Sequence, residues 1–221
     1  MADADMDDRT LDELRLDLAP VVAESAVFDG WTDAAVTSAA ELAGIDPGAA
    51  RFAFGDRPMA MINAWIGSID RAMVAEMIAE RVGNLPIRER IRSLVQFRLD
   101  ALIGKEEALR RALIEMARPR NLAETARLSW RSADVMWRLA GDTATDYNHY
   151  TKRATLAALY ASTLAVFAQD KSDGHAETRA FLARRIDDVM RFEKAKARVL
   201  RPRQDTFSVT RLLGRLRYPA V

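Results

Sequence analysis

The sequence contains no cysteine and only two histidines, His149 and His175, among its 221 residues. Disulfide bonds, zinc sites with thiolate ligands and cysteine nucleophiles are therefore excluded. A ferritin-like di-iron site needs a Glu-x-x-His motif on two helices, and the sequence contains none. Asp146 lies three residues before His149, but a surface Asp–His pair explains this helical spacing better than a metal site does. We therefore expect no metal ion and no cofactor.

The motifs of common nucleotide-dependent and hydrolytic enzymes are also missing. No Walker loop, no Gly-x-Gly-x-x-Gly and no Gly-x-Ser-x-Gly occurs, so phosphoryl transfer, dinucleotide binding and serine hydrolysis have no support. We interpret the chain as a binding protein and not as an enzyme. A metal or cofactor in the purified protein would indicate an enzyme instead.

Long apolar runs are absent as well. No run approaches the ~20 residues that cross a bilayer, so we predict no transmembrane helix. The first eight residues contain four aspartates and no apolar segment, which is unlike a secretory signal or an Arg-rich organelle transit peptide. We expect a cytoplasmic protein whose first nine residues are disordered.

Charge is distributed unevenly, although the formal net charge is only +1. Residues 1–50 contain twelve acidic side chains and two basic ones, whereas residues 191–221 contain nine basic side chains and two acidic ones. Such asymmetry predicts different partners at the two ends of the chain. The alternative is that both are solvated faces without a partner.

Helix start and stop signals dominate the sequence. Thr10 and Glu13 form a capping box, Gly44 suits the end of a helix, and Pro47 and Pro86 suit first helical positions. The helices predicted from such signals span about residues 11–28, 32–43, 46–55, 58–82, 86–103, 105–118, 121–139, 146–168, 175–200 and 205–217. No segment alternates apolar and polar residues as a strand requires. The predicted fold class is all-α, with about nine helices and a C-terminal amphipathic helix.

The first three predicted helices form a helix-turn-helix-like unit over residues 10–56. A helical body over residues 57–200 follows, and a hinge with an amphipathic helix over residues 201–221 ends the chain. The small residue Ala40 and the turn residue Gly44 let two short helices cross closely, and this layout is typical of TetR-type transcription regulators.

DNA binding is not expected of this unit. Affinity for a duplex comes largely from Lys and Arg side chains that neutralise phosphates. The helix in the reading position, Asp46 to Phe54, has one basic residue, Arg51, and the unit around it is strongly acidic. We therefore predict no nucleic-acid partner, and a ligand-responsive transcription regulator is kept as the alternative function.

A dense stretch of polar and aromatic residues lies at residues 137–153. Gly141 ends one predicted helix, and the next places Asp146, His149 and Tyr150 on one helical face. Aromatic side chains with a polar end favour interfaces, because they are apolar at one end and can hydrogen-bond at the other. Helix capping and core packing alone do not explain so many such residues beside a turn.

This stretch resembles the TetR-like lipid-binding accessory proteins of coenzyme Q (ubiquinone) biosynthesis, the ninth protein of the Coq series. The residues that carry the resemblance are Ala140-Gly141-Asp142, Asp146, Asn148, Tyr150-Thr151-Lys152-Arg153, Leu156-Ala157 and Tyr160, with Met116, Pro119 and Asn121 before them and Phe181-Leu182, Arg185, Asp188 and Met190 after them. The resemblance covers most of residues 10–200. It implies a TetR-like helical fold that binds an isoprenoid lipid, docks on a membrane and presents quinone precursors to the di-iron demethoxyubiquinone hydroxylase.

The resemblance also implies a surface for the hydroxylase. In eukaryotic relatives that surface includes an Asp, a Trp and a Tyr, which Asp146 and Tyr150 match, whereas His149 stands in the place of the Trp. The predicted partner-binding residues are Met136, Asp142, Asp146, His149, Tyr150, Lys152 and Arg153. Eukaryotic members have a transit peptide, so we expect a bacterial protein, peripherally attached to the inner membrane, and a homodimer.

The lipid cavity is expected between the long helices that run from Met59 to Ala168. The candidate lining residues are Met73, Met77, Leu94, Phe97, Met136, Trp137, Leu156 and Tyr160. Methionine suits an adaptable apolar pocket, but each of these side chains could equally be packed core.

The C-terminal segment has the pattern of a helix that lies in a membrane interface. On a helical wheel Val209, Leu212, Leu213 and Leu216 fall within an arc of about 100°. Arg211, Arg215 and Arg217 flank that arc, and each could add about 1 kcal/mol of attraction to an anionic surface. The alternative is a final helix that packs on the body.

Overall fold

The computed structural model describes residues 10–77, 84–143 and 147–200. Its α-helices are α1 (Leu11–Asp29), α2 (Asp33–Ala43), α3 (Pro47–Phe54), α4 (Pro58–Glu76), α6 (Ile87–Asp100), α7 (Glu106–Met116), α8 (Leu122–Leu139), α9 (Tyr147–Phe167) and α10 (Ala176–Leu200). Short 3₁₀ turns at Pro119–Asn121 and Asp173–His175 precede α8 and α10. No strand occurs in these residues, and the predicted all-α class is confirmed.

The helix ends follow the local signals of the sequence. Thr10 accepts a hydrogen bond from the backbone N–H of Glu13, and the Glu13 carboxylate accepts one in return from the Thr10 N–H at 2.9 Å. Gly44 adopts the left-handed conformation with φ = 67°, which costs glycine little. The predicted fourth helix was extended to Val82. It ends at Glu76, and residues 78–83 lie outside the described part.

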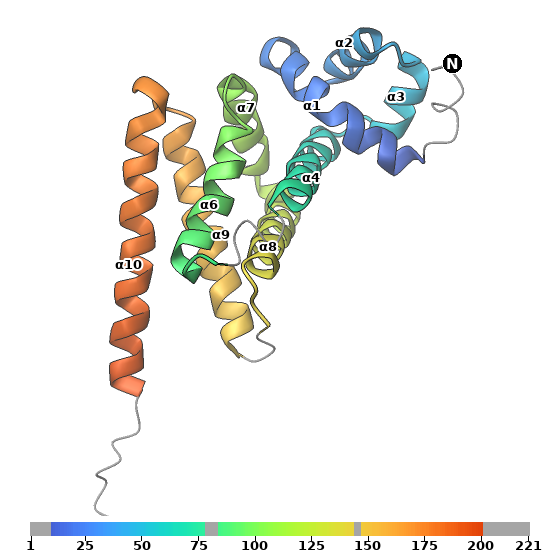
Figure 1. Ribbon diagram of the computed structural model, residues 1–221. Coiled ribbons are helices and arrows are strands. Elements are labelled where there is room, and N and C mark those ends of the chain that lie inside the picture. The colour runs from blue at the N-terminus through green and yellow to red at the C-terminus, as the bar shows by residue number, and fades with distance from the viewer. Residues whose placement is uncertain (1–9, 78–83, 144–146, 201–221) are drawn as a thin grey trace, which may run out of the picture. The chain divides into compact units, whose positions relative to one another are not determined.

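The chain divides into two compact units, residues 1–186 and residues 187–221. The predicted boundary at residues 56/57 falls within the first unit. Trp31 shows why, because its ring lies 5.2 Å from that of Trp65 in α4 and its indole N–H donates to the carbonyl of Ala108 in α7 at 3.0 Å. The three-helix unit is thereby joined to two helices of the body (Figure 1).

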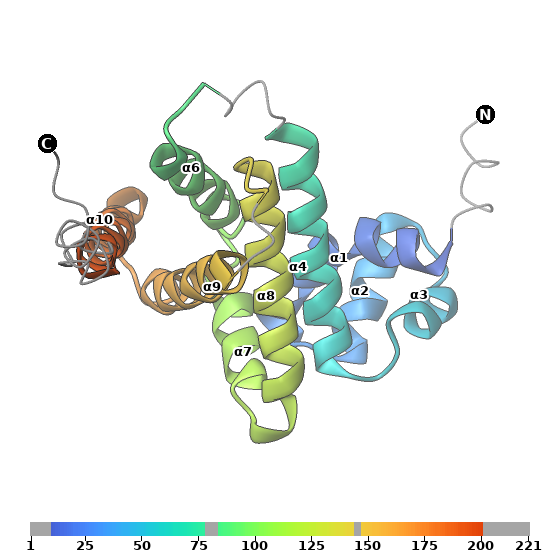
Figure 2. The same cartoon turned by 90° about the horizontal axis from the view of Figure 1, so that it is seen from below.

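The body is built around α4 and α8, which lie side by side (Figures 1 and 2). α4 buries an apolar face that includes Met61, Ile62, Trp65 and Met73. Helices α6, α7 and α9 also pack on α8. None of the described helices is long and apolar enough to cross a membrane.

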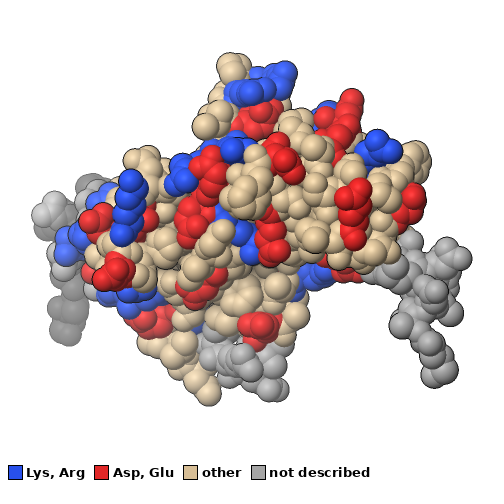
Figure 3. All heavy atoms as spheres, turned by 90° about the horizontal axis from the view of Figure 1, so that it is seen from above, with Lys and Arg blue, Asp and Glu red and all other residues tan. Residues whose placement is uncertain are grey.

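The helix-turn-helix-like unit lacks the basic side chains that DNA binding requires. α3 occupies the place of a reading helix, but Arg51 is its one basic residue and its Phe52 side chain is exposed. Asp46 is engaged in capping α3, where it accepts from the Ala49 N–H at 2.7 Å. On the face drawn in Figure 3, the described basic side chains are interspersed with acidic ones and form no continuous basic surface.

Candidate functional site

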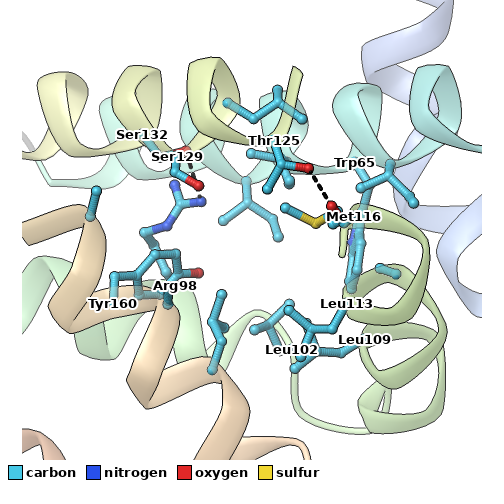
Figure 4. Close-up of a pocket in the computed structure, with 18 of the residues that line it drawn as sticks. Trp65, Arg98, Leu102, Leu109, Leu113, Met116, Thr125, Ser129, Ser132 and Tyr160 are labelled. Atoms are coloured by element: carbon cyan, nitrogen blue, oxygen red, sulfur yellow. Dashed lines mark hydrogen bonds between the residues drawn. The ribbon is translucent and has the colours of Figure 1, made fainter. Parts of the chain in front are cut away.

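A cavity of about 220 Å³ lies among α4, α6, α7, α8 and α9 (Figure 4). Helices α4, α7, α8 and α9 contribute residues at helical spacing, for example Ile62, Trp65 and Ile69 from α4, and α6 contributes Arg98. Small side chains such as Ala112 and Ala157 line the cavity between the larger ones. Since these side chains do not reach across to the facing helices, a space is left where five helices meet.

One end of the cavity is polar. Arg98 of α6 is buried there, donates to the Asp70 carboxylate, and donates to the Ser132 hydroxyl at 3.2 Å. Ser132 in turn donates to the second Asp70 oxygen at 3.2 Å. Tyr160 covers the guanidinium, with its ring centroid 4.9 Å from Arg98 Cζ. Three helices and the Tyr160 ring of a fourth thus surround one buried charge.

Arg98 remains charged in this environment. Burial opposes the charge, but the neighbouring Tyr160 and Asp70 outweigh it and hold the pKa of the guanidinium above its usual range. Two of the three guanidinium nitrogens bond to Asp70 and Ser132. The third, Nε, is buried and has no hydrogen-bond partner among the described residues.

Away from Arg98 the lining is mostly apolar, and the Thr125 hydroxyl there already donates to the carbonyl of Met116 at 2.9 Å (Figure 4). Three of the lining residues, Ala117, Leu122 and Ala161, are exposed at the surface, and Leu122 leaves 54% of its area accessible. They come from the end of α7, the start of α8 and the middle of α9. The cavity therefore has an apolar mouth and a polar inner end.

The predicted lipid-binding residues are only partly at this cavity. Tyr160 lines it, and the other seven predicted residues do not. Of these seven, Met73, Leu94, Met136 and Leu156 are buried core side chains, whereas Met77, Phe97 and Trp137 are half-buried. Helical periodicity identifies an apolar face, but not which of its residues border an unfilled space.

The turn between α8 and α9 is held by a buried ionic network. Arg153 leaves 2% of its side chain exposed and contacts Asp134 at 2.5 Å and Asp142 at 3.1 Å. It also donates to the carbonyl of His149 at 3.1 Å. Lys152 reaches the other oxygen of Asp142 at 2.6 Å. Asp142 and Arg153 were predicted to contact a partner; in the structure their largely buried side chains stabilise the turn, and a partner contact by them stays a prediction.

Gly141 and Trp137 complete this turn. Gly141 has φ = 86°, and a Cβ there would lie 3.1 Å from Nη1 of Arg90, which donates to the carbonyl of Ala140 at 2.9 Å. The Trp137 indole donates to the carbonyl of Lys152 at 3.0 Å. These contacts fix the start of α9 against α8.

An aromatic patch formed by Trp130, His149 and Tyr150 lies at the α8–α9 packing. The ring centroids are 6.4 Å apart for Trp130 and His149, 6.0 Å for Trp130 and Tyr150, and 5.2 Å for His149 and Tyr150. Tyr150 is 61% exposed. The sequence analysis missed Trp130, although it lies seven residues, or two helical turns, before Trp137. Trp130 thus brings an indole beside His149.

Other predicted site residues lie elsewhere. Met136 is buried and therefore does not face a partner. Asp146 lies outside the described residues, as do the predicted disordered tail at residues 1–9 and the hinge and amphipathic helix at residues 201–221. The membrane residues proposed in that helix are Val209, Arg211, Leu212, Leu213, Arg215, Leu216 and Arg217.

Comparisons with known proteins place these features in context. Residues 122–193 match the COQ9 family model. The chain is 33% identical over 168 residues to the mitochondrial ubiquinone biosynthesis protein COQ9 of Homo sapiens, an alignment that covers 73% of this chain and 52% of the human protein. It is 25% identical over 188 residues to the COQ9 protein of Drosophila melanogaster, covering 83% of this chain and 57% of that protein. The chain thus spans about half the length of these relatives.

A solved structure supports the fold. The TetR transcriptional regulator of Nitrosomonas europaea superposes with a TM-score of 0.64 at 20% identity, covering 80% of this chain and 98% of that one. This likeness shows a TetR-like fold and says nothing of DNA binding. The segment matched by the family model contains the aromatic patch and the α8 and α9 walls of the cavity, whereas Asp70 and Arg98 lie before it.

Proposed function

From the resemblance to the COQ9 family, which the match over residues 122–193 confirms, we propose that the chain is a non-enzymatic accessory protein of ubiquinone biosynthesis. It binds an isoprenoid lipid or quinone precursor and presents it to the demethoxyubiquinone hydroxylase at a membrane. The observation that carries the proposal is the apolar cavity in the helical body, which opens at the surface beside α7, α8 and α9. Few convergent polar groups in an otherwise apolar pocket are typical of small-molecule sites.

The first test fills the cavity. Ala157 lines it, whereas Ala154, three residues earlier on α9, is exposed. Ala157→Phe is expected to weaken binding of a long-chain ubiquinone at least tenfold, because the phenyl ring takes the space of the ligand. Ala154→Phe is expected to bind as wild type. Native mass spectrometry of protein from a quinone-producing host, followed by titration of delipidated protein, measures both.

Thermal unfolding serves as the control for this pair. Both variants should remain helical, since overpacking costs typically about 1–3 kcal/mol. Wild-type protein that neither carries nor takes up any isoprenoid lipid would contradict the proposal. Equal binding by the two variants would place the lipid elsewhere.

We propose the aromatic patch as the hydroxylase contact. Tyr150 is its most exposed member, and large aromatic side chains often dominate interface energies. Tyr150→Ala is expected to weaken hydroxylase binding by tenfold or more, which is about 1.4 kcal/mol, without loss of helicity. Phe28→Ala removes an even more exposed ring, near the C-terminal end of α1, and is expected to have no effect. Isothermal titration with purified hydroxylase compares them, and equal losses would show that the patch is not specific.

The remaining parts of the proposal concern attachment and assembly. The basic amphipathic segment at residues 205–217 would bind an anionic membrane, as its pattern of aliphatic and arginine residues suggests. Peripheral attachment at the bacterial inner membrane and a homodimeric assembly stay predictions.

A further inference from the structure

We propose that the cavity takes the ring of a neutral quinone or phenol with its oxygen toward Arg98, while the isoprenoid tail leaves through the mouth at Ala117, Leu122 and Ala161. This inference rests on the proposed function and adds the orientation of the bound ligand in the cavity. It also assigns Arg98 a role in ligand recognition, beyond its pairing with Asp70.

The first support is the polarity of the cavity from end to end. Around the Arg98 guanidinium lie the hydroxyl-bearing side chains Ser129, Ser132 and Tyr160 (Figure 4). The exposed lining residues at the mouth carry no polar side-chain atom. A ligand with an oxygen-bearing ring and a hydrocarbon tail matches this arrangement in one orientation only.

The second support is the unpaired donor. Arg98 Nε is buried and lacks a hydrogen-bond partner among the described residues, whereas Nη1 and Nη2 donate to Asp70 and Ser132. Buried polar groups are nearly always hydrogen-bonded. Because an N–H can only donate, the missing partner is an acceptor such as a carbonyl or hydroxyl oxygen.

The third support is charge. Asp70 pairs with Arg98 behind the cavity wall and offsets its charge, so a phosphate or carboxylate in the cavity would meet little net positive charge at Arg98. Arg131 approaches the same carboxylate at 4.0 Å, but its side chain is half-exposed and does not line the cavity. A neutral oxygen is therefore the better match for the free Nε–H.

The fourth support is size. A cavity of about 150 Å³ can hold benzene, and this one measures about 220 Å³. There is room for one substituted six-membered ring and for little more. A polyprenyl chain cannot fit as a whole, so most of it must lie outside the mouth.

The experiment uses three probes on delipidated full-length protein: decylubiquinone, decylbenzene and farnesol. Decylbenzene keeps the ring and tail but lacks the oxygens, and farnesol is an isoprenoid without a ring. Wild type is expected to bind decylubiquinone at least tenfold more tightly than either of the others. Arg98→Lys keeps a cation for Asp70 but removes Nε, and it should abolish this preference while leaving decylbenzene binding unchanged.

A second pair of variants keeps the test independent of the folding of Arg98→Lys. Ser129→Leu fills the polar end of the cavity, and Ala126→Leu adds the same side chain at an exposed position of α8. The first should lose the preference for decylubiquinone and the second should keep it. A preference that survives in Ser129→Leu, or no preference in wild type, overturns the orientation and leaves lipid binding intact. Failure of all three probes to bind overturns the proposed function itself.

Discussion

Asp70→Ala is expected to lower the free energy of unfolding by about 3–5 kcal/mol, the cost of leaving one partner of a buried ion pair without the other. Arg98 exposes 2% of its side chain and stays charged. Removal of the Asp70 carboxylate therefore leaves a buried cation without its counter-ion. The Ser132 hydroxyl loses its acceptor as well. Urea unfolding followed by circular dichroism measures the loss.

Asp17→Ala is the matched control for this prediction. Asp17 pairs with Arg71, the next residue after Asp70 on α4, at 2.6 Å, but both side chains are well exposed. Exposed pairs contribute about 0–1 kcal/mol, so the control should cost little. A double variant, Asp70→Leu with Arg98→Met, should recover most of the loss, because apolar replacement of a buried pair is often neutral. Equal costs for Asp70→Ala and Asp17→Ala would contradict the interpretation.

The helices could be predicted because their signals are local. Thr10, Gly44, Pro47 and Gly141 each act on a few neighbouring residues, and the structure confirms the helices that they begin or end. The C-terminus of α4 was the main difference, since the apolar pattern continues past Glu76 where the helix stops. Local patterns thus predict the presence of a helix better than they predict the residue at which it ends.

The cavity could not be predicted in the same way. It depends on which small side chains from five helices face one another, and the sequence does not contain that information directly. A signal for its polar end was nevertheless present. Arg98 lies seven residues after Ile91 and four after Leu94, both buried, and so occupies the apolar face of α6. Asp70 likewise lies between buried Ile69 and Met73 on α4.

At the α8–α9 turn, the sequence predicted the segment that contains the site, but not which of its residues are buried and which are exposed. Residues 137–153 contribute to a buried network around Arg153 and to the aromatic patch, which also includes Trp130 and of which Tyr150 is exposed. Residue type alone does not distinguish these roles, because Lys, Arg and Asp suit a surface contact as well as a buried pair. Burial decides between them, and it depends on how α9 packs on α8.

Arg153→Met is expected to destabilise the protein by about 3–5 kcal/mol, because it leaves Asp142 and Asp134 without their shared buried cation. The Asp142 side chain is 4% exposed, and its contact with Lys152 would remain. Arg153→Lys should rescue little, since one ammonium cannot replace the planar guanidinium that reaches Asp134, Asp142 and the His149 carbonyl together.

Arg138→Met provides the matched control, because Arg138 contacts the same Asp134 carboxylate at 2.9 Å with a side chain that is 72% exposed. It should cost less than about 1 kcal/mol. The two variants should also differ at the aromatic patch. Loss of Arg153 releases the start of α9 and should weaken hydroxylase binding even at temperatures where the protein remains folded, whereas loss of Arg138 should not. Chemical denaturation gives the stabilities and titration with the hydroxylase gives the affinities. Equal stabilities of the two variants would show that the network around Arg153 does not hold the turn.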